Sequence, residues 1–178
     1  MRGSQHLALG VAIGSLVAAS HFTTVDEKVL FAVPCVIGEL FPDIDISTSK
    51  LGSKTFGASS VINKVFGHRG FVHTPVNAVI ITGLIYLISN LFLTNVNAAV
   101  ISFGFFTGFI LHLLQDTFTR GGIMWFWPIP FKIRFTKLKS DSPWCWVITG
   151  VIFLSVLFTP FAEDIFKTMF KLYFSMFG

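Results

Sequence analysis

Charged residues are scarce in this sequence: aspartate, glutamate, lysine and arginine make up 12% of 178 residues, whereas 53% are hydrophobic. The mean hydropathy is +0.74. A soluble domain of this length could not bury so much apolar surface, and the 22 phenylalanines suit helix surfaces in contact with lipid better than the interior of a small globule. The composition therefore excludes an ordinary soluble protein and predicts one integral-membrane domain over residues 1–178.

Cysteine is nearly absent as well. Cys35 and Cys145 form neither a C-x-x-C pair nor a disulfide framework, and we interpret both as helix-packing residues. The net charge of +4 could suggest nucleic acid, but the basic residues lie in short stretches between apolar runs rather than along one polar face. We therefore expect no nucleic-acid partner.

Five apolar runs predict membrane segments. Pro75–Thr94, Ala98–Phe118 and Trp144–Ala162 are each long enough to cross the hydrocarbon core. Leu7–Phe22 and Val29–Phe41 are shorter, and they form either a thin spanning hairpin or a partly re-entrant one. The predicted fold class is all-α: a polytopic transmembrane helical bundle with four to five membrane segments.

The two ends of the chain each have their own interpretation. The tail 161–177 places Asp164, Lys167 and Lys171 at helical spacing among phenylalanines, which predicts an amphipathic helix lying on the membrane surface. The first run follows Arg2 and resembles a cleavable signal peptide. Cleavage would leave a chain that begins at a second apolar run, so we favour a retained helix.

The basic residues predict the orientation. If all five runs cross, the N-terminus, the loop 43–71 and the loop 119–143 share one side of the membrane, with ten lysines and arginines against three on the other. This bias predicts that the three polar stretches are cytoplasmic. The ten are Arg2, Lys50, Lys54, Lys64, Arg69, Arg120, Lys132, Arg134, Lys137 and Lys139, and the three are Lys28, Lys167 and Lys171.

Ionisable residues inside or beside the apolar runs gather at that same interface. Burying such a group in a membrane segment costs several kcal/mol, so each one is a functional candidate. Glu39 lies near the end of the second run, and His21 alone among the histidines falls at the opposite side. The candidate metal ligands are His6, Asp43, Asp45, His68, His73, His112 and Asp116.

Two local patterns favour a metal. His112 and Asp116 are four residues apart, so a helix presents them on one face, where they either grip an ion or form a hydrogen-bonded pair. Asp43 and Asp45 follow Pro42, which ends the helix. Two close acids repel each other unless a cation intervenes, and the alternative is a pair of ordinary surface acids.

A third pattern adds imidazoles. His68 and His73 straddle Gly70, and Arg69 could hold an anion beside them; the alternative is a basic segment touching lipid headgroups. Histidines and aspartates without a thiolate suit zinc, with manganese as an alternative. Seven candidates exceed the needs of one tetrahedral ion, so more than one divalent ion is expected.

The order of these motifs resembles the LexA-regulated inner-membrane metal-dependent hydrolase family, the YdjM-like proteins. The resemblance covers His6 to about Phe135 and rests on the sequence blocks Pro42-Asp43-Ile44-Asp45, Ser49-Lys50-Leu51-Gly52, His68 to Thr74, His112-x-x-x-Asp116, and Gly121-Gly122 through Trp127-Pro128. The same histidines and acids resemble the ligands of zinc-dependent phospholipase C. The resemblance implies a bacterial inner-membrane protein that hydrolyses a phosphoester near the membrane surface.

The hypothesis assigns roles within this set. A metal-activated water is the nucleophile, Asp45 positions it, and Arg69 counters charge on the phosphoryl group. Glu39 is an additional ligand, a general base or a protonated packing residue. The sequence departs from the family pattern at Glu39, at Ile46-Ser47 and at Val72.

The expected partners are membrane lipid and a small-molecule or lipid phosphoester. The loop 119–143, with Trp125 and Trp127 ahead of four basic residues, suits either membrane anchoring or binding of anionic headgroups. Two other functions stay open: a cation or proton transporter, and a metal-binding protein without turnover that is induced by stress.

Overall fold

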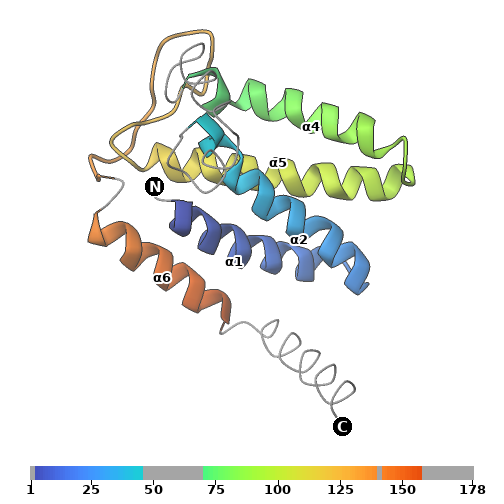
Figure 1. Ribbon diagram of the computed structural model, residues 1–178. Coiled ribbons are helices and arrows are strands. Elements are labelled where there is room, and N and C mark those ends of the chain that lie inside the picture. Colours follow the sequence, from blue (N-terminus) through green and yellow to red (C-terminus); the bar gives the residue numbers. More distant parts are fainter. Residues whose placement is uncertain (1–2, 46–69, 140–141, 158–178) are drawn as a thin grey trace.

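The computed structural model describes residues 3–45, 70–139 and 142–157 (Figure 1). Within these residues the fold is helical, and the only β-type pairing is an isolated bridge between Ile123 and Ile133, which confirms the predicted helical class for this part of the chain. The α-helices are α1 (Gly3–His21), α2 (Val25–Leu40), α4 (Pro75–Ser89), α5 (Asn95–Thr117) and α6 (Pro143–Leu157), and the short 3₁₀ helices are η1 (Pro42–Asp45) and η3 (Phe71–His73).

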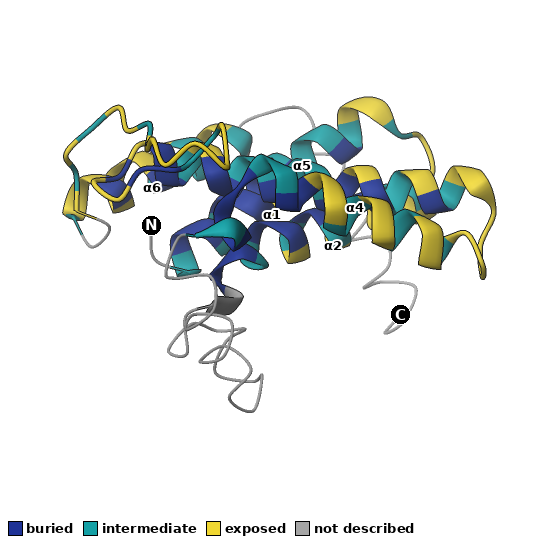
Figure 2. Ribbon diagram, turned by 90° about the horizontal axis from the view of Figure 1, so that it is seen from above, coloured by how far each residue is buried: buried dark blue, intermediate teal, exposed yellow. Residues whose placement is uncertain are grey.

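The helices form two hairpins and a flanking helix. Helices α1 and α2 make the first hairpin, α4 and α5 make the second, and α6 packs on α1 (Figure 1). The start of α1, the end of α2, the start of α4 and the end of α5 consequently lie at the same end of the bundle. Figure 2 shows the buried residues where α1, α2 and α5 meet, and exposed ones at the α4–α5 link.

A capping box sets the turn between α1 and α2. The Thr24 hydroxyl accepts a hydrogen bond from the Glu27 backbone N–H at 3.3 Å, and the Glu27 carboxylate accepts one from the Thr24 backbone N–H at 3.3 Å. These bonds satisfy N–H groups that have no partner inside a helix. Helix α2 therefore begins at Val25, four residues before the predicted run Val29–Phe41.

The second helix crosses α5 at very short range because α5 carries glycine where the backbones meet. A Cβ atom at Gly104 would lie 2.3 Å from the Phe31 carbonyl oxygen, and one at Gly108 would lie 1.8 Å from the Cys35 carbonyl oxygen. Glycines four residues apart allow such close helix packing, which is common in membranes. This contact positions the end of α2 against the last turns of α5.

Among the described helices, α5 alone is long and apolar enough to cross a membrane. Helices α4 and α6 are apolar but shorter, so the predicted four to five spans are not confirmed. The run Pro75–Thr94 is helical only to Ser89, because the chain turns there and Thr94 caps α5 by accepting a hydrogen bond from the Asn97 N–H at 3.3 Å. The predicted tail helix 161–177 lies outside the described residues.

The segment after α5 folds back onto the end of that helix. The Phe135 N–H donates to the Thr117 carbonyl at 2.9 Å, and the Arg120 N–H donates to the Leu138 carbonyl at 2.8 Å. The Trp125 indole N–H donates to the Thr117 hydroxyl at 2.9 Å. Residues 119–139 thus cover the end of the bundle where four chain segments converge.

Candidate metal centre

Five of the seven predicted ligands meet at the converged end of the bundle. His6 lies in the first turns of α1, Asp43 in η1, His73 in η3, and His112 with Asp116 in the last turns of α5. All five side chains are buried. The fold thus gathers residues that are up to 110 positions apart in the sequence (116 minus 6).

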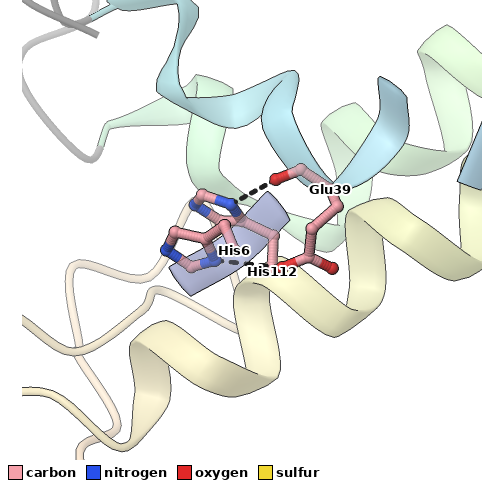
Figure 3. A group of neighbouring side chains, drawn as sticks. All are labelled: His6, Glu39 and His112. Atoms are coloured by element: carbon pink, nitrogen blue, oxygen red, sulfur yellow. Dashed lines mark hydrogen bonds and ion pairs between the residues drawn. The ribbon is translucent and has the colours of Figure 1, made fainter. Parts of the chain in front are cut away.

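His112 is oriented by a hydrogen bond from its inner nitrogen. Its Nδ1 atom lies 2.7 Å from the backbone carbonyl oxygen of Glu39, so Nδ1 carries the proton and donates (Figure 3). The Nε2 atom then has a free lone pair, is buried, and has no hydrogen-bond partner among the described residues. It lies 3.8 Å from an oxygen of Asp43 and 3.8 Å from an oxygen of Asp116.

His6 repeats this arrangement. Its Nδ1 atom lies 2.9 Å from the Glu39 carboxylate oxygen Oε1, and its ring stacks on that of His112 with centroids 3.9 Å apart (Figure 3). The Nε2 atom is buried without a hydrogen-bond partner in the described part of the chain and lies 3.6 Å from Asp116 Oδ1. Asp116 therefore presents one carboxylate oxygen to each imidazole.

Glu39 holds both imidazoles through different atoms. Its side chain accepts from His6 and also from the Gln115 amide at 2.7 Å, while its backbone carbonyl accepts from His112. Histidines that bind metals commonly donate their second ring N–H to a carboxylate or a backbone carbonyl, which fixes the tautomer and the ring orientation. Glu39 accepts this second hydrogen bond from two rings, those of His6 and His112.

Asp43 and His73 complete the second side of the cluster. The Thr74 hydroxyl caps α4 by accepting from the Asn77 N–H at 3.2 Å, and this cap places His73 directly before the helix. His73 Nε2 lies 3.9 Å from Asp43 Oδ1. Burial raises the pKa of Asp43, but the imidazoles of His73, His112 and His6 outweigh it and lower that pKa to about 2. Asp43 is therefore a carboxylate at neutral pH.

These spacings fit a cation between the side chains better than direct hydrogen bonds. Contacts of 3.6–3.9 Å are too long for a hydrogen bond. Two ligands on one tetrahedral zinc, each about 2.0–2.2 Å from the ion, lie roughly 3.4 Å apart. Two groups have potential ligand atoms within 4.8 Å of one another: His6, Glu39 and His112, and Asp43, His73 and His112.

Three predicted site residues are not placed by the structure. His68 and Arg69 lie outside the described residues, and only the backbone of Asp45, in η1, is described. Their predicted roles stay predictions. A further residue, Gln115, donates its amide to Glu39 and was not predicted from the sequence. The feature of the sequence that could have indicated Gln115 is a polar amide inside an apolar run, three residues after His112.

The fold and the cluster define a class: an α-helical membrane protein with buried histidine and carboxylate groups that could bind a metal. The chain belongs to the YdjM inner membrane protein family, whose sequence model matches residues 1–172. This match confirms the resemblance to the YdjM-like proteins that the sequence motifs indicated.

The chain is also similar to several named bacterial proteins. The chain is 34% identical to the uncharacterized protein YvsG of Bacillus subtilis over 134 residues, covering 75% of this chain and 78% of that protein. It is 31% identical to the inner membrane protein YdjM of Escherichia coli over 104 residues, covering 58% of this chain and 52% of that protein. The inner membrane protein YbcI of E. coli is 27% identical, with coverage of 89% and 80%.

No solved structure matches the chain. The family and the names of the relatives support a location in the bacterial inner membrane, as predicted.

Proposed function

We propose that the protein is a membrane-bound, metal-dependent hydrolase that acts on a phosphoester or phospholipid-like substrate at the cytoplasmic face of the inner membrane. One observation carries the proposal. The Nε2 atoms of His6 and His112 are buried without hydrogen-bond partners in the described chain, and each faces an oxygen of Asp116. Leaving such polar atoms unsatisfied is costly unless a ligand engages them.

The donor set supports a divalent cation, with zinc preferred and manganese as the alternative. Imidazole and carboxylate ligands without thiolate suit both ions. His6, His73, His112, Asp43 and Asp116 would hold the metal, and the two oxygens of Asp116 face different imidazoles, which favours more than one ion. A bound divalent ion supplies a lowered pKa for water and a positive charge for a phosphoryl oxygen.

The remaining roles follow from positions near this cluster. Glu39 orients His6 and His112 and so keeps their outer nitrogens directed at the cluster. We keep Asp45 as the residue that positions the attacking water and Arg69 as the group that neutralises phosphoryl charge, because both are close in sequence to cluster members. A multi-pass arrangement with a cytoplasmic N-terminus rests on the excess of basic residues in the polar stretches. LexA regulation and the likeness to zinc-dependent phospholipase C rest on the sequence resemblance alone.

Metal analysis combined with turnover tests the proposal. Wild-type protein, His112→Ala and Asp43→Ala would be purified in detergent, their metal content measured by mass spectrometry, and hydrolysis assayed on phosphomonoesters, phosphodiesters and phospholipids. We expect wild type to retain metal and to hydrolyse one of these classes, and both variants to lose metal and activity. His21→Ala, a histidine at the far end of α1, is the matched control and should behave as wild type.

A second candidate is a cation-binding or cation-transporting membrane protein without turnover. Complete burial favours it, because the side chains of His6, His73 and His112 are each 0% exposed. Metal retention without hydrolysis of any tested phosphoester would favour this candidate. Wild-type protein that binds no divalent ion would refute both.

A further inference from the structure

A cavity lies beside the metal centre, between α1, α5 and α6. It has a volume of about 380 Å³, within the range of about 300–1,000 Å³ that is typical of small-molecule sites. Its walls are almost entirely apolar. They include Leu9 and Ile13 of α1, Leu111 and Leu114 of α5, and Ile148 and Ile152 of α6.

Basic residues stand at the loop end of this cavity. Thr119 and Leu138 belong to its lining there, and each adjoins exposed basic residues in the sequence: Arg120 beside the first, and Lys137 and Lys139 beside the second. The hydrogen bond from the Arg120 N–H to the Leu138 carbonyl, at 2.8 Å, holds the two chain segments together. Three exposed cations are therefore sequence neighbours of lining residues at this end of the cavity.

One lining residue also has an unused acceptor. The Gln115 amide nitrogen donates to Glu39, but its Oε1 atom is buried and has no hydrogen-bond partner among the described residues. Walls that are otherwise apolar favour a hydrocarbon occupant.

We propose that this cavity binds one hydrocarbon chain of an anionic phospholipid, with the headgroup at Arg120, Lys137 and Lys139. The hydrocarbon chain explains the apolar walls, and the negative headgroup explains the cations, since lysine and arginine near a membrane surface attract anionic lipid. This lipid site is distinct from the metal centre. The proposal does not depend on whether the metal centre hydrolyses a phosphoester.

Lipid retention by the 178-residue protein tests whether the site prefers an anionic headgroup. Native mass spectrometry in detergent would compare phosphatidylglycerol with phosphatidylcholine of identical chains. We expect one phosphatidylglycerol to bind roughly tenfold more tightly than phosphatidylcholine. The triple variant Arg120→Gln, Lys137→Gln, Lys139→Gln changes only exposed side chains and should abolish this preference. Equal retention of the two lipids by wild type would overturn the proposal.

Filling the cavity tests whether it binds the hydrocarbon chain of the lipid. Ile148→Trp enlarges a cavity-lining side chain that is 47% exposed and should reduce phosphatidylglycerol retention about tenfold, while Leu84→Trp, 49% exposed on α4 and outside the lining, should leave it unchanged. Gel filtration and thermal unfolding would show that both variants fold; if Ile148→Trp does not, the triple charge variant decides. Unchanged retention by folded Ile148→Trp would refute chain binding. His112→Ala should keep the lipid, which separates this proposal from the proposed hydrolase.

Discussion

At the scale of single residues, the site depends on which nitrogen of each imidazole carries a proton. Glu39 determines this for both rings, because its carboxylate accepts from His6 Nδ1 and its carbonyl accepts from His112 Nδ1. When the rings are neutral, the outer nitrogens are then free of protons and available to a cation. A carboxylate that does not itself need to bind the ion can thus control whether the ion binds.

Replacing Glu39 should weaken metal binding without removing a proposed ligand. Glu39→Ala frees the His6 ring but leaves the backbone carbonyl that orients His112, so we expect metal affinity to fall about 10- to 100-fold. Glu39→Gln keeps one acceptor oxygen and should lose less. Metal titration of purified protein measures both. Asp26→Ala, an exposed acid on the same helix, is the control, and an unchanged affinity in Glu39→Ala would contradict the orienting role.

Metal binding should also weaken as the pH falls. Imidazoles bind metal only when neutral, so protons compete with the ion for histidine ligands as the pH is lowered from about 8 to 5. Asp43 does not contribute to this change, because its pKa of about 2 keeps it charged throughout. Metal content measured after dialysis at stepped pH should decline toward pH 5. Metal retention that does not change over this range would argue against histidine ligands.

At the scale of helices, the close contact between α2 and α5 positions the site. Glycine at positions 104 and 108 lets the carbonyls of Phe31 and Cys35 approach α5, and one turn further along, the Glu39 carbonyl reaches His112. The helix contact and the orientation of His112 are therefore parts of one arrangement. A side chain at Gly108 would disturb both.

Gly108→Ala should destabilise the protein and release metal together. The new Cβ would lie 1.8 Å from the Cys35 carbonyl oxygen, so α2 must move, at a cost of about 1–3 kcal/mol or more. Thermal unfolding in detergent and metal content measure the two effects. Gly83→Ala is the matched control, since within the described residues a Cβ there would meet no atom beyond its own stretch of helix within 4 Å. Equal stability of the two variants would show that the helices are not in close contact at Gly108.

At the scale of the whole molecule, every described member of the cluster lies at one end of the bundle and His21 lies at the other. Helix α1 begins near His6 and ends at His21, about 22 Å further along the helix axis. Helix α5 begins at Asn95 after the α4–α5 link and ends at the cluster. An orientation that places the cluster in the cytoplasm therefore places the α4–α5 link outside.

Cysteine labelling in spheroplasts tests this orientation. In a background of Cys35→Ala and Cys145→Ala, a maleimide that cannot cross the membrane should label Phe92→Cys in the α4–α5 link. It should leave Phe131→Cys, in the loop after α5, unlabelled until lysis. Both side chains are exposed, at 80% and 61%, so accessibility within the protein is comparable. Labelling of Phe131→Cys before lysis would reverse the proposed orientation.

Much of the site was accessible from the sequence because charge is rare in apolar segments. His6, Asp43, His73, His112 and Asp116 were all predicted to share one interface, and the structure brings them together. Helix ends were harder to predict, because the apolar run Pro75–Thr94 continues through the turn that follows Ser89. The bond between Gln115 and Glu39 could not be predicted, since it joins residues 76 positions apart.

The amino-acid sequence by itself determined the helical membrane class, the family and the side chains available to a cation, because hydropathy, charge placement and motif order are local properties of the chain. Only the tertiary structure decided which atoms face one another. The role of Glu39, the direction of each imidazole and the cavity between α1, α5 and α6 all depend on how close two helices can approach. That distance is set by the packing of backbones at glycines such as Gly108, which spacing along one chain does not reveal.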